Sequence, residues 1–183
     1  ESDDMGPYGS WANGAAMRVA PAVWLTESLA ETQYRAHHTA VVTHNTEEAV
    51  RGAVAVASAI YLARTGIRRD DMRIYLHDRF YPLDRRLEDI RCDYVFTSRT
   101  SCSVPEAIEA FLESTDYEDA VRNAISLGGD TDTQAAIAGS IAEAYYGIPE
   151  PMCQKAASYL PEEIRQQIDR FYTYIHERKK RIP

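Results

Sequence analysis

The sequence predicts an all-α protein, a compact helical bundle that forms one domain over residues 1–183. Two observations predict this fold class. Helix-start signals recur along the chain, each followed by a helix-compatible run that ends at glycine or proline, and no long stretch alternates between apolar and polar residues. With 45% hydrophobic and 26% charged residues, the chain has ordinary globular composition and is long enough to bury a core.

In the first half of the chain, the expected helices are 22–38, 49–64, 70–77 and 84–91. The second of them has the clearest boundaries. Asn45-Thr46-Glu47-Glu48 has the N-x-x-E spacing of a capping box, and Thr65-Gly66 is a typical helix end. These signals predict a helix of about 16 residues between them.

In the second half, the expected helices are 107–113, one that ends at Leu127, 131–146 and a long one opened by Pro161. Ser103-Val104-Pro105-Glu106 combines capping-box spacing with a proline in the first turn. Thr115-Asp116-Tyr117-Glu118 repeats the capping signal ahead of the helix that ends at Leu127. The segment 93–102 is the least helical, and we expect it to cross the bundle as a loop.

Charge and cysteine content narrow the functional class. The formal net charge of -8 argues against a nucleic-acid or anionic-membrane surface, although a small anionic ligand needs only a few arginines or helix N-termini. Cys92, Cys102 and Cys153 are odd in number and form no C-x-x-C pair, so we expect reduced, partly buried thiols. No signal peptide or apolar span is visible. We expect a cytoplasmic protein.

The most informative stretch begins at Gly128-Gly129 and continues with Asp130-Thr131-Asp132-Thr133. The glycines allow a sharp turn, and the small residues that follow allow the next helix to pack closely. The aspartates and threonines are good helix caps, and capping is the simpler interpretation. Four oxygen-bearing side chains at the head of a buried helix also suit a hard divalent cation such as Mg²⁺ or Mn²⁺.

Two other interpretations of this stretch fail. An EF-hand loop beginning at Asp130 needs glycine at its sixth position and glutamate at its twelfth, where this chain has Ala135 and Ile141. A phosphatase-type aspartyl nucleophile ends a hydrophobic strand, whereas residues 119–127 have a helical pattern. Capping and cation binding therefore remain.

Four segments together resemble the ADP-ribosylglycohydrolase family, including its dinitrogenase-reductase-activating type. They are YGSWANGAAMRVAP (8–21), VTHN (42–45), SVPEA (103–107) and LGGDTDTQAAIAG (127–139). They occur in the family's order, and the resemblance extends from about Tyr8 to Pro149. One departure is Ala12, where the family usually has glycine.

The resemblance implies an all-α fold of this family and a two-metal site that takes Mg²⁺ or Mn²⁺. The implied metal ligands are Asp130, Asp132 and Thr133. The residues implied to line the ADP-ribose cleft are Asn13, Gly14, Ala15, Met17 and His44. An Asn-Gly turn would expose backbone amides that suit diphosphate oxygens. Taken alone, His44 fits a core or capping role, and Arg18 fits either a phosphate or a carboxylate partner.

The implied function is a metal-dependent hydrolase that removes ADP-ribose from protein side chains or small ADP-ribose conjugates. The alternative is a non-catalytic ADP-ribose-binding or structural relative with an incomplete metal site. A metal pair can orient the ribose hydroxyls and activate a water against an oxocarbenium-like transition state.

The family's N-terminal part, which carries the other metal ligands and a catalytic acidic residue, has no clear match here. We therefore expect that this part is missing and that the catalytic residue belongs to it. Asp3 and Asp4 are interpreted as a solvated acidic loop. The expected partners are ADP-ribose or an ADP-ribosylated protein, with the missing segment or a second copy as further candidates.

Overall fold

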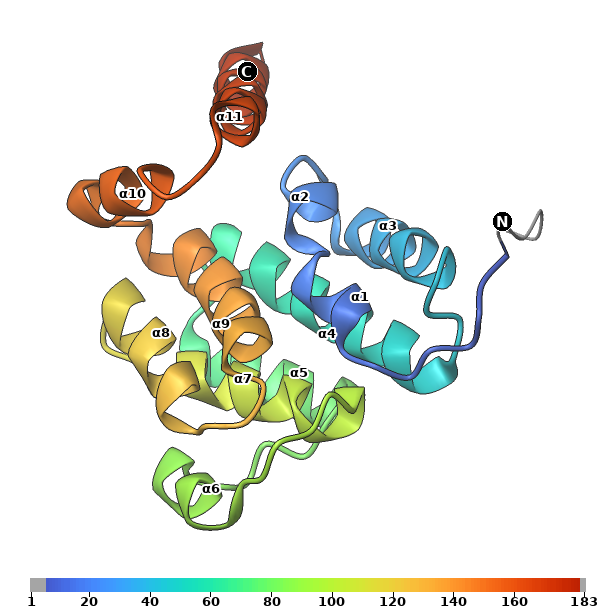
Figure 1. Cartoon of the computed structure of the whole chain (residues 1–183). Helices are drawn as coiled ribbons and strands as arrows, with labels where there is room; N and C mark the ends of the chain where they lie inside the picture. The colour runs from blue at the N-terminus through green and yellow to red at the C-terminus, as the bar shows by residue number, and fades with distance from the viewer. Residues whose placement is uncertain (1–5, 182–183) are drawn as a thin grey trace. The chain divides into compact units, whose positions relative to one another are not determined.

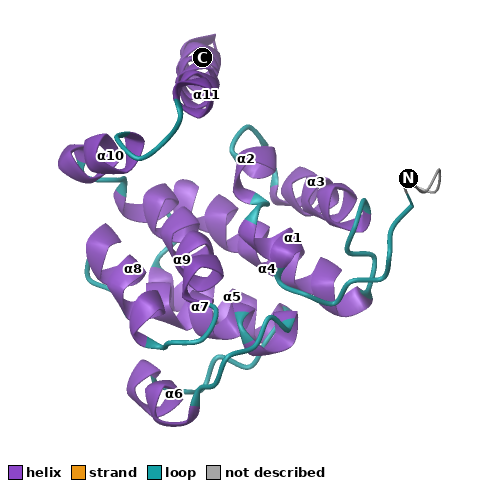
Figure 2. Ribbon diagram, viewed as in Figure 1, coloured by secondary structure: helices purple, strands orange, loops and turns teal. Residues whose placement is uncertain are grey.

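The computed structural model describes residues 6–181, and the side chains of residues 6–178. Over this part the chain is helical and contains no strand, apart from an isolated antiparallel bridge between Ala12 and Arg99 (Figure 2). The all-α prediction is confirmed. Asp3 and Asp4 lie outside the described residues.

The chain divides into two compact units, residues 1–147 and 148–183. The boundary follows Gly147, which ends a helix with a φ of 76°. Each unit is described by itself, and a single domain over 1–183 stays a prediction. The second unit contains α10 (Glu150–Ala157), which the sequence analysis missed, and α11 (Glu162–Arg181), which begins one residue after Pro161 as expected.

The elements of the first unit, in chain order, are α1 (Gly14–Met17), α2 (Ala20–Val23), α3 (Leu29–Val41), α4 (Glu47–Arg64), α5 (Arg69–Arg79), α6 (Leu87–Asp93), the 3₁₀ helix η1 (Thr100–Cys102), α7 (Val104–Leu112), α8 (Tyr117–Ser126) and α9 (Thr131–Tyr146). Helix α4 is central and contacts α1, α3, α5 and α9 (Figure 1). Its buried positions are mostly alanines, so neighbouring helices approach it closely.

The single helix expected over 22–38 is wrong. Two helices, α2 and α3, replace it, because Ser28 caps α3 by accepting a hydrogen bond from the Glu31 N–H at 3.1 Å. Glu31 in turn accepts from the Glu27 N–H at 3.0 Å, one residue before the N–H that a capping box uses, so Ser28 and Glu31 form a variant of that motif. Arg64 of α4 donates to backbone carbonyls of the loop between α2 and α3 and holds it in place.

The other helices begin near the expected positions, but the side chains that make the capping hydrogen bonds differ from those expected. Thr46 caps α4 by accepting from the Ala49 N–H, whereas the sequence analysis placed the start at Asn45. Asp116 caps α8 by accepting from the Asp119 N–H. Ser103 precedes α7 as expected but makes no capping hydrogen bond, because its hydroxyl serves a tertiary contact described below.

All three cysteines are exposed, so the expectation of partial burial is wrong; Cys92, for example, donates to the Glu88 carbonyl of its own helix. Among the described helices, none combines the length and the apolar character that a membrane crossing requires.

Gly52 tests the close packing of α4. A Cβ at this position would overlap the Cγ2 methyl of Thr100, whose hydroxyl is fixed by a 2.8 Å hydrogen bond to the Trp11 carbonyl. Gly52→Ala should therefore lower the free energy of unfolding, because overpacking costs about 1–3 kcal/mol against about 1 kcal/mol of helix propensity gained. Chemical denaturation measures the change.

The double variant Gly52→Ala/Thr100→Ser provides the control. Serine keeps the hydroxyl and removes the obstructing methyl, so the cost of Gly52→Ala should be smaller in the Thr100→Ser background. An equal cost in both backgrounds would contradict this packing argument.

Candidate functional site

The short helix α1 brings the predicted site together, beginning with Asn13, the residue before it. Asn13 is 4% exposed, and its side-chain amide donates to Ser103 Oγ at 3.1 Å and to Asp130 Oδ2 at 2.8 Å. Its backbone N–H donates to the Ser98 carbonyl at 2.9 Å. Both donors of one amide group thus join α1 to the starts of α7 and α9.

The turn before α9 has the conformation that its glycines predict. Gly128 and Gly129 have φ values of 77° and 71°, which other residues rarely adopt. Gly129 also lacks room for a side chain, since a Cβ would lie 2.8 Å from Tyr94 Cε1. The Tyr94 hydroxyl accepts a 2.7 Å hydrogen bond from the fully buried Gln134, and burial raises the pKa of Tyr94. The ring therefore braces the turn that leads into Asp130.

The two carboxylates lie at the N-terminus of α9. Asp130 is at the N-cap position, yet its side chain makes no capping hydrogen bond; it accepts from Asn13 instead. Asp132 is exposed, and the Thr133 N–H donates to its Oδ1 at 2.9 Å. This hydrogen bond, with that of the neighbouring Asp130 carboxyl, lowers the pKa of Asp132. Asp130 is thus not merely a cap, and the helix N-terminus favours negative charge here.

Thr133 and Met17 connect α9 to α1 a second time. The Thr133 hydroxyl is buried and lies 3.5 Å from Met17 Sδ, to which it donates. Ala15, between Gly14 and Met17 in sequence, packs its methyl into the hydrophobic core. Of these cleft-lining predictions, Met17 reaches the carboxylate end of the site and the Ala15 side chain does not.

His44 lies against the other side of α1. It is 6% exposed, and its Nε2 lies 3.0 Å from the position that a Cβ of Gly14 would take. Burial, with the positive charge of Arg18, lowers the pKa of His44. Asn13 lies in a turn and Gly14 begins helix α1, and the exposure of backbone amides to a ligand stays a prediction. The reason for glycine here is the close approach of His44.

The predicted residues therefore form two adjoining groups on α1. Asn13 and Met17 contact the Asp130 and Thr133 side, and Gly14 contacts His44. Asp130, Asp132 and Thr133 offer the hard oxygen atoms that Mg²⁺ or Mn²⁺ takes. Among the residues that the structure describes, no group of three or more histidine, cysteine, aspartate or glutamate side chains is placed to hold a metal ion.

Two site residues, Ser103 and Arg18, have partners in the fold that local sequence patterns do not indicate. Ser103 was interpreted as a cap, although its hydroxyl accepts from Asn13 and donates to the Arg99 carbonyl. For Arg18, a phosphate or a carboxylate partner was left open, and the structure shows hydrogen bonds to Thr43 and to the Thr39 carbonyl. Ser103, Arg18 and Thr43 all lie inside the segments that carry the family resemblance, which was the available signal.

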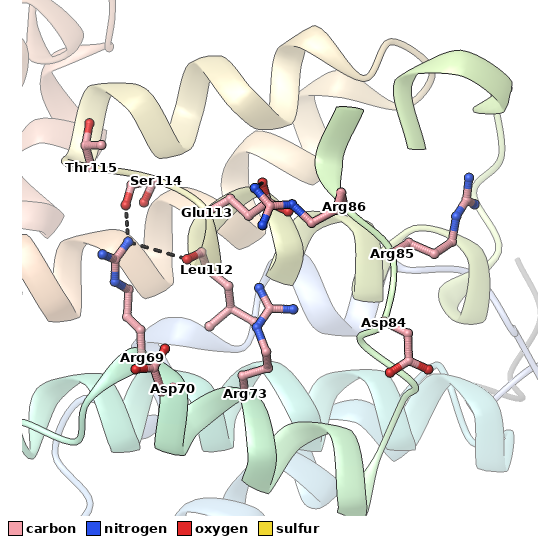
Figure 3. A pocket seen from close by; sticks show the side chains of 10 residues that line it. All are labelled: Arg69, Asp70, Arg73, Asp84, Arg85, Arg86, Leu112, Glu113, Ser114 and Thr115. Atoms are coloured by element: carbon pink, nitrogen blue, oxygen red, sulfur yellow. Dashed lines mark hydrogen bonds and ion pairs between the residues drawn. The ribbon is translucent and has the colours of Figure 1, made fainter. Parts of the chain in front are cut away.

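A polar cavity of about 380 Å³ lies between α5, the loop before α6 and the end of α7 (Figure 3). It shares no residue with the candidate site. Its four arginines already have protein partners: Arg69 donates to the Leu112 and Ser114 carbonyls, and Arg73, Arg85 and Arg86 each pair with a carboxylate. The four arginines that line this cavity therefore make hydrogen bonds and ion pairs within the first unit.

The loop that carries Ser98 is fixed by Glu48 of α4. Arg99 donates to both carboxylate oxygens of Glu48, at 3.0 to 3.3 Å, and the N–H and hydroxyl of Ser101 donate to Glu48 Oε1. The hydrogen bond from Arg99, followed by those from Ser101, lowers the pKa of Glu48 to about 2. One carboxylate therefore organises the backbone next to Asn13.

A family model described as ADP-ribosylglycohydrolase matches residues 1–181 of this chain. The human ADP-ribosylhydrolase ARH3 is 30% identical over 210 residues, which cover 87% of this chain and 57% of that protein. The ADP-ribosylarginine hydrolase Tri1 of Pseudomonas putida (strain GB-1) is 32% identical over 146 residues, covering 74% of this chain and 38% of that protein.

Among solved structures, a chain of an ADP-ribosylglycohydrolase-related protein complex aligns with a TM-score of 0.61 at 26% identity. The alignment covers 79% of this chain and 54% of that chain. This chain thus spans little more than half the length of these relatives at most.

Glu48→Gln should destabilise the protein in a pH-dependent way. Because folding depresses the pKa of Glu48 from 4.5 to about 2, its ionised form stabilises the folded state above pH 4.5. That contribution is lost as the pH falls towards 2. The difference in thermal stability between wild type and Glu48→Gln should therefore be largest at neutral pH and shrink between pH 4.5 and 2.

Glu47→Gln is the matched control, because the neighbouring Glu47 side chain is 88% exposed and pairs only with Arg51. It should have a small effect, as exposed ion pairs do. A constant gap between wild type and Glu48→Gln across this pH range would refute the role given to Glu48.

Proposed function

This chain belongs to the ADP-ribosylglycohydrolase family, and on that premise we propose that it takes part in the metal-dependent hydrolysis of ADP-ribose from protein side chains or small ADP-ribose conjugates. The observation that carries the proposal is the 2.8 Å hydrogen bond between Asn13 and Asp130. It holds the helix expected to line the ADP-ribose cleft against the carboxylates expected to bind metal.

The metal part of the proposal assigns Mg²⁺ or Mn²⁺ to Asp130, Asp132 and Thr133. Asp132 is exposed and its pKa is lowered, so it is ionised at neutral pH and accessible to a cation. Asp130 accepts from Asn13 through Oδ2, and its carboxyl lies beside that of Asp132, so both carboxyls could contribute oxygen atoms to one cation. Such a metal would supply Lewis acidity and an activated water.

The remaining residues would bind and orient the ligand. Gly14 and Met17 present α1 as one wall, and the buried His44 presents a ring nitrogen beside Gly14. Asn13 keeps this wall and the carboxylates in fixed register, which matters because correct placement of reacting groups can lower a barrier by roughly 7–11 kcal/mol. The substrate class proposed is ADP-ribose attached through its ribose to a protein side chain or small molecule.

The metal assignment predicts that Mn²⁺ binding depends on the two aspartates. Asp130→Asn/Asp132→Asn keeps the shape of both side chains and removes both charges. Since losing an outer-shell partner of a metal ligand already costs roughly 10–100-fold in affinity, losing both carboxylates should cost at least as much. Isothermal calorimetry with Mn²⁺ measures this, with Glu118→Gln on the exposed face of α8 as the control. Equal uptake by wild type and the double variant would refute the assignment.

The ligand assignment predicts thermal protection by ADP-ribose. At about 100 times its dissociation constant, ADP-ribose should stabilise the folded state by roughly 2.7 kcal/mol. His44→Ala should weaken this protection, while the same change at the exposed His38 should not. The companion assay follows release of ADP-ribose from an ADP-ribosylated protein with Mg²⁺ or Mn²⁺. Binding without release would favour a binding protein, and no protection at millimolar ADP-ribose would refute the ligand assignment.

A further inference from the structure

Three side chains form a continuous row of hydrogen bonds beside α1. Arg18, just after α1, donates to Thr43 Oγ1 at 2.6 Å, and Thr43 Oγ1 lies 2.7 Å from Nδ1 of His44. The opposite ring nitrogen of His44, Nε2, faces Gly14. The row therefore runs from an exposed guanidinium to the side of a buried imidazole that faces Gly14.

Arg18 sets the direction of the first hydrogen bond. A guanidinium only donates and stays protonated in proteins, so Thr43 Oγ1 must be the acceptor. Arg18 also donates to the Thr39 carbonyl at 3.3 Å, in the last turn of α3. A helix C-terminus favours a cation and needs donors for its free carbonyls, and Arg18 supplies both. His44, two residues beyond the C-cap of α3, is therefore not needed as the cation at this helix end.

The Thr43 hydroxyl, which accepts from Arg18, can in turn donate to His44. A threonine hydroxyl has one hydrogen, and the acceptor that the structure places in front of it is His44 Nδ1. In the reverse arrangement, an Nδ1–H of His44 and an N–H of Arg18 would both point at the same hydroxyl oxygen. The hydroxyl hydrogen would then lose the acceptor 2.7 Å away. The first arrangement satisfies all three groups.

The charge state of His44 agrees with this arrangement. The side chain is 6% exposed, and burial together with the charge of Arg18 lowers the pKa of His44. A doubly protonated ring would need a donor at Nδ1, directed towards the hydroxyl that already accepts from Arg18. Geometry and charge therefore both favour a neutral ring.

We propose that Arg18 and Thr43 are positioning residues that hold His44 as the neutral tautomer with its proton on Nε2. His44 then presents an N–H donor to the cleft beside Gly14. It selects a ligand group that can accept a hydrogen bond there, such as a phosphate or hydroxyl oxygen. The last step rests on the proposed function, whereas the tautomer itself is a property of the ligand-free protein.

The tautomer can be read directly by long-range ¹⁵N–¹H correlation of the imidazoles in the uniformly labelled chain, with His44→Asn used to assign the signals. We expect an unprotonated, pyridine-type Nδ1 and a protonated Nε2 in the wild type at neutral pH. A protonated Nδ1 would overturn the proposal. This measurement needs no ligand and no variant that must fold beyond the one used for assignment.

A matched pair of variants tests whether the Thr43 hydroxyl sets the tautomer of His44. Thr43→Val keeps the side-chain shape and removes the hydroxyl, and it should increase the share of the Nδ1–H tautomer. Thr43→Ser restores the hydroxyl and should restore the wild-type pattern. If Thr43→Val leaves the tautomer unchanged, Thr43 does not set it and the proposal is wrong. Arg18→Met should act in the same direction as Thr43→Val, because it removes the donor that orients the hydroxyl.

Binding of ADP-ribose gives the second readout. Because a typical hydrogen bond contributes about 0.5–1.5 kcal/mol, Thr43→Val should weaken binding about twofold to tenfold, with Thr43→Ser close to wild type. If wild type and both variants bind ADP-ribose with equal affinity, the proposal that the Nε2–H of His44 donates to the ligand is wrong. If the wild type binds no ADP-ribose at all, the proposed function fails, while the spectrum of the ligand-free protein still decides the tautomer.

Discussion

The side-chain amide of Asn13 is the interaction on which the site depends. Its two N–H donors are divided between a hydroxyl on the start of α7 and a carboxylate on the start of α9. No other residue of similar size offers two donors and no charge at that point. An aspartate of the same shape would place a second carboxylate against Asp130 and leave the Ser103 hydroxyl without its donor. This amide therefore joins the N-terminal end of α1 to the starts of α7 and α9.

Close packing of small residues makes the arrangement possible. Helices α4 and α9 pack against each other, each buries alanines and a glycine, and α1 lies against both. In such an interior an added methyl group displaces a neighbour, as the overlap at Gly52 shows. The same constraint operates in the site, where Gly14 and Gly129 each make room for an aromatic ring. Rigid packing therefore holds the polar groups, and the polar groups fix the helix ends.

Local signals in the sequence predicted part of this structure. The helix over 131–146 and the turn at Gly128-Gly129 follow from capping chemistry and glycine conformation, which depend on neighbouring residues alone. The break at Ser28 was also local, but a long helical pattern on both sides obscured it. The roles of Ser103 and Asn13 were beyond local reasoning, because their partners come from distant elements. Family resemblance drew attention to His44, and only the fold shows that Gly14 is its neighbour.

The long-range character of these contacts has a kinetic consequence. Asn13 is separated by 90 residues from Ser103 and by 117 from Asp130, so both hydrogen bonds close most of the first unit into loops. Contacts that close long loops carry a larger entropic cost and tend to form after local ones. The turn at Gly129 also packs closely against the ring of Tyr94, which comes from another loop of the chain. We therefore expect the candidate site to assemble late in folding, so that an intact site would report that the unit has folded completely.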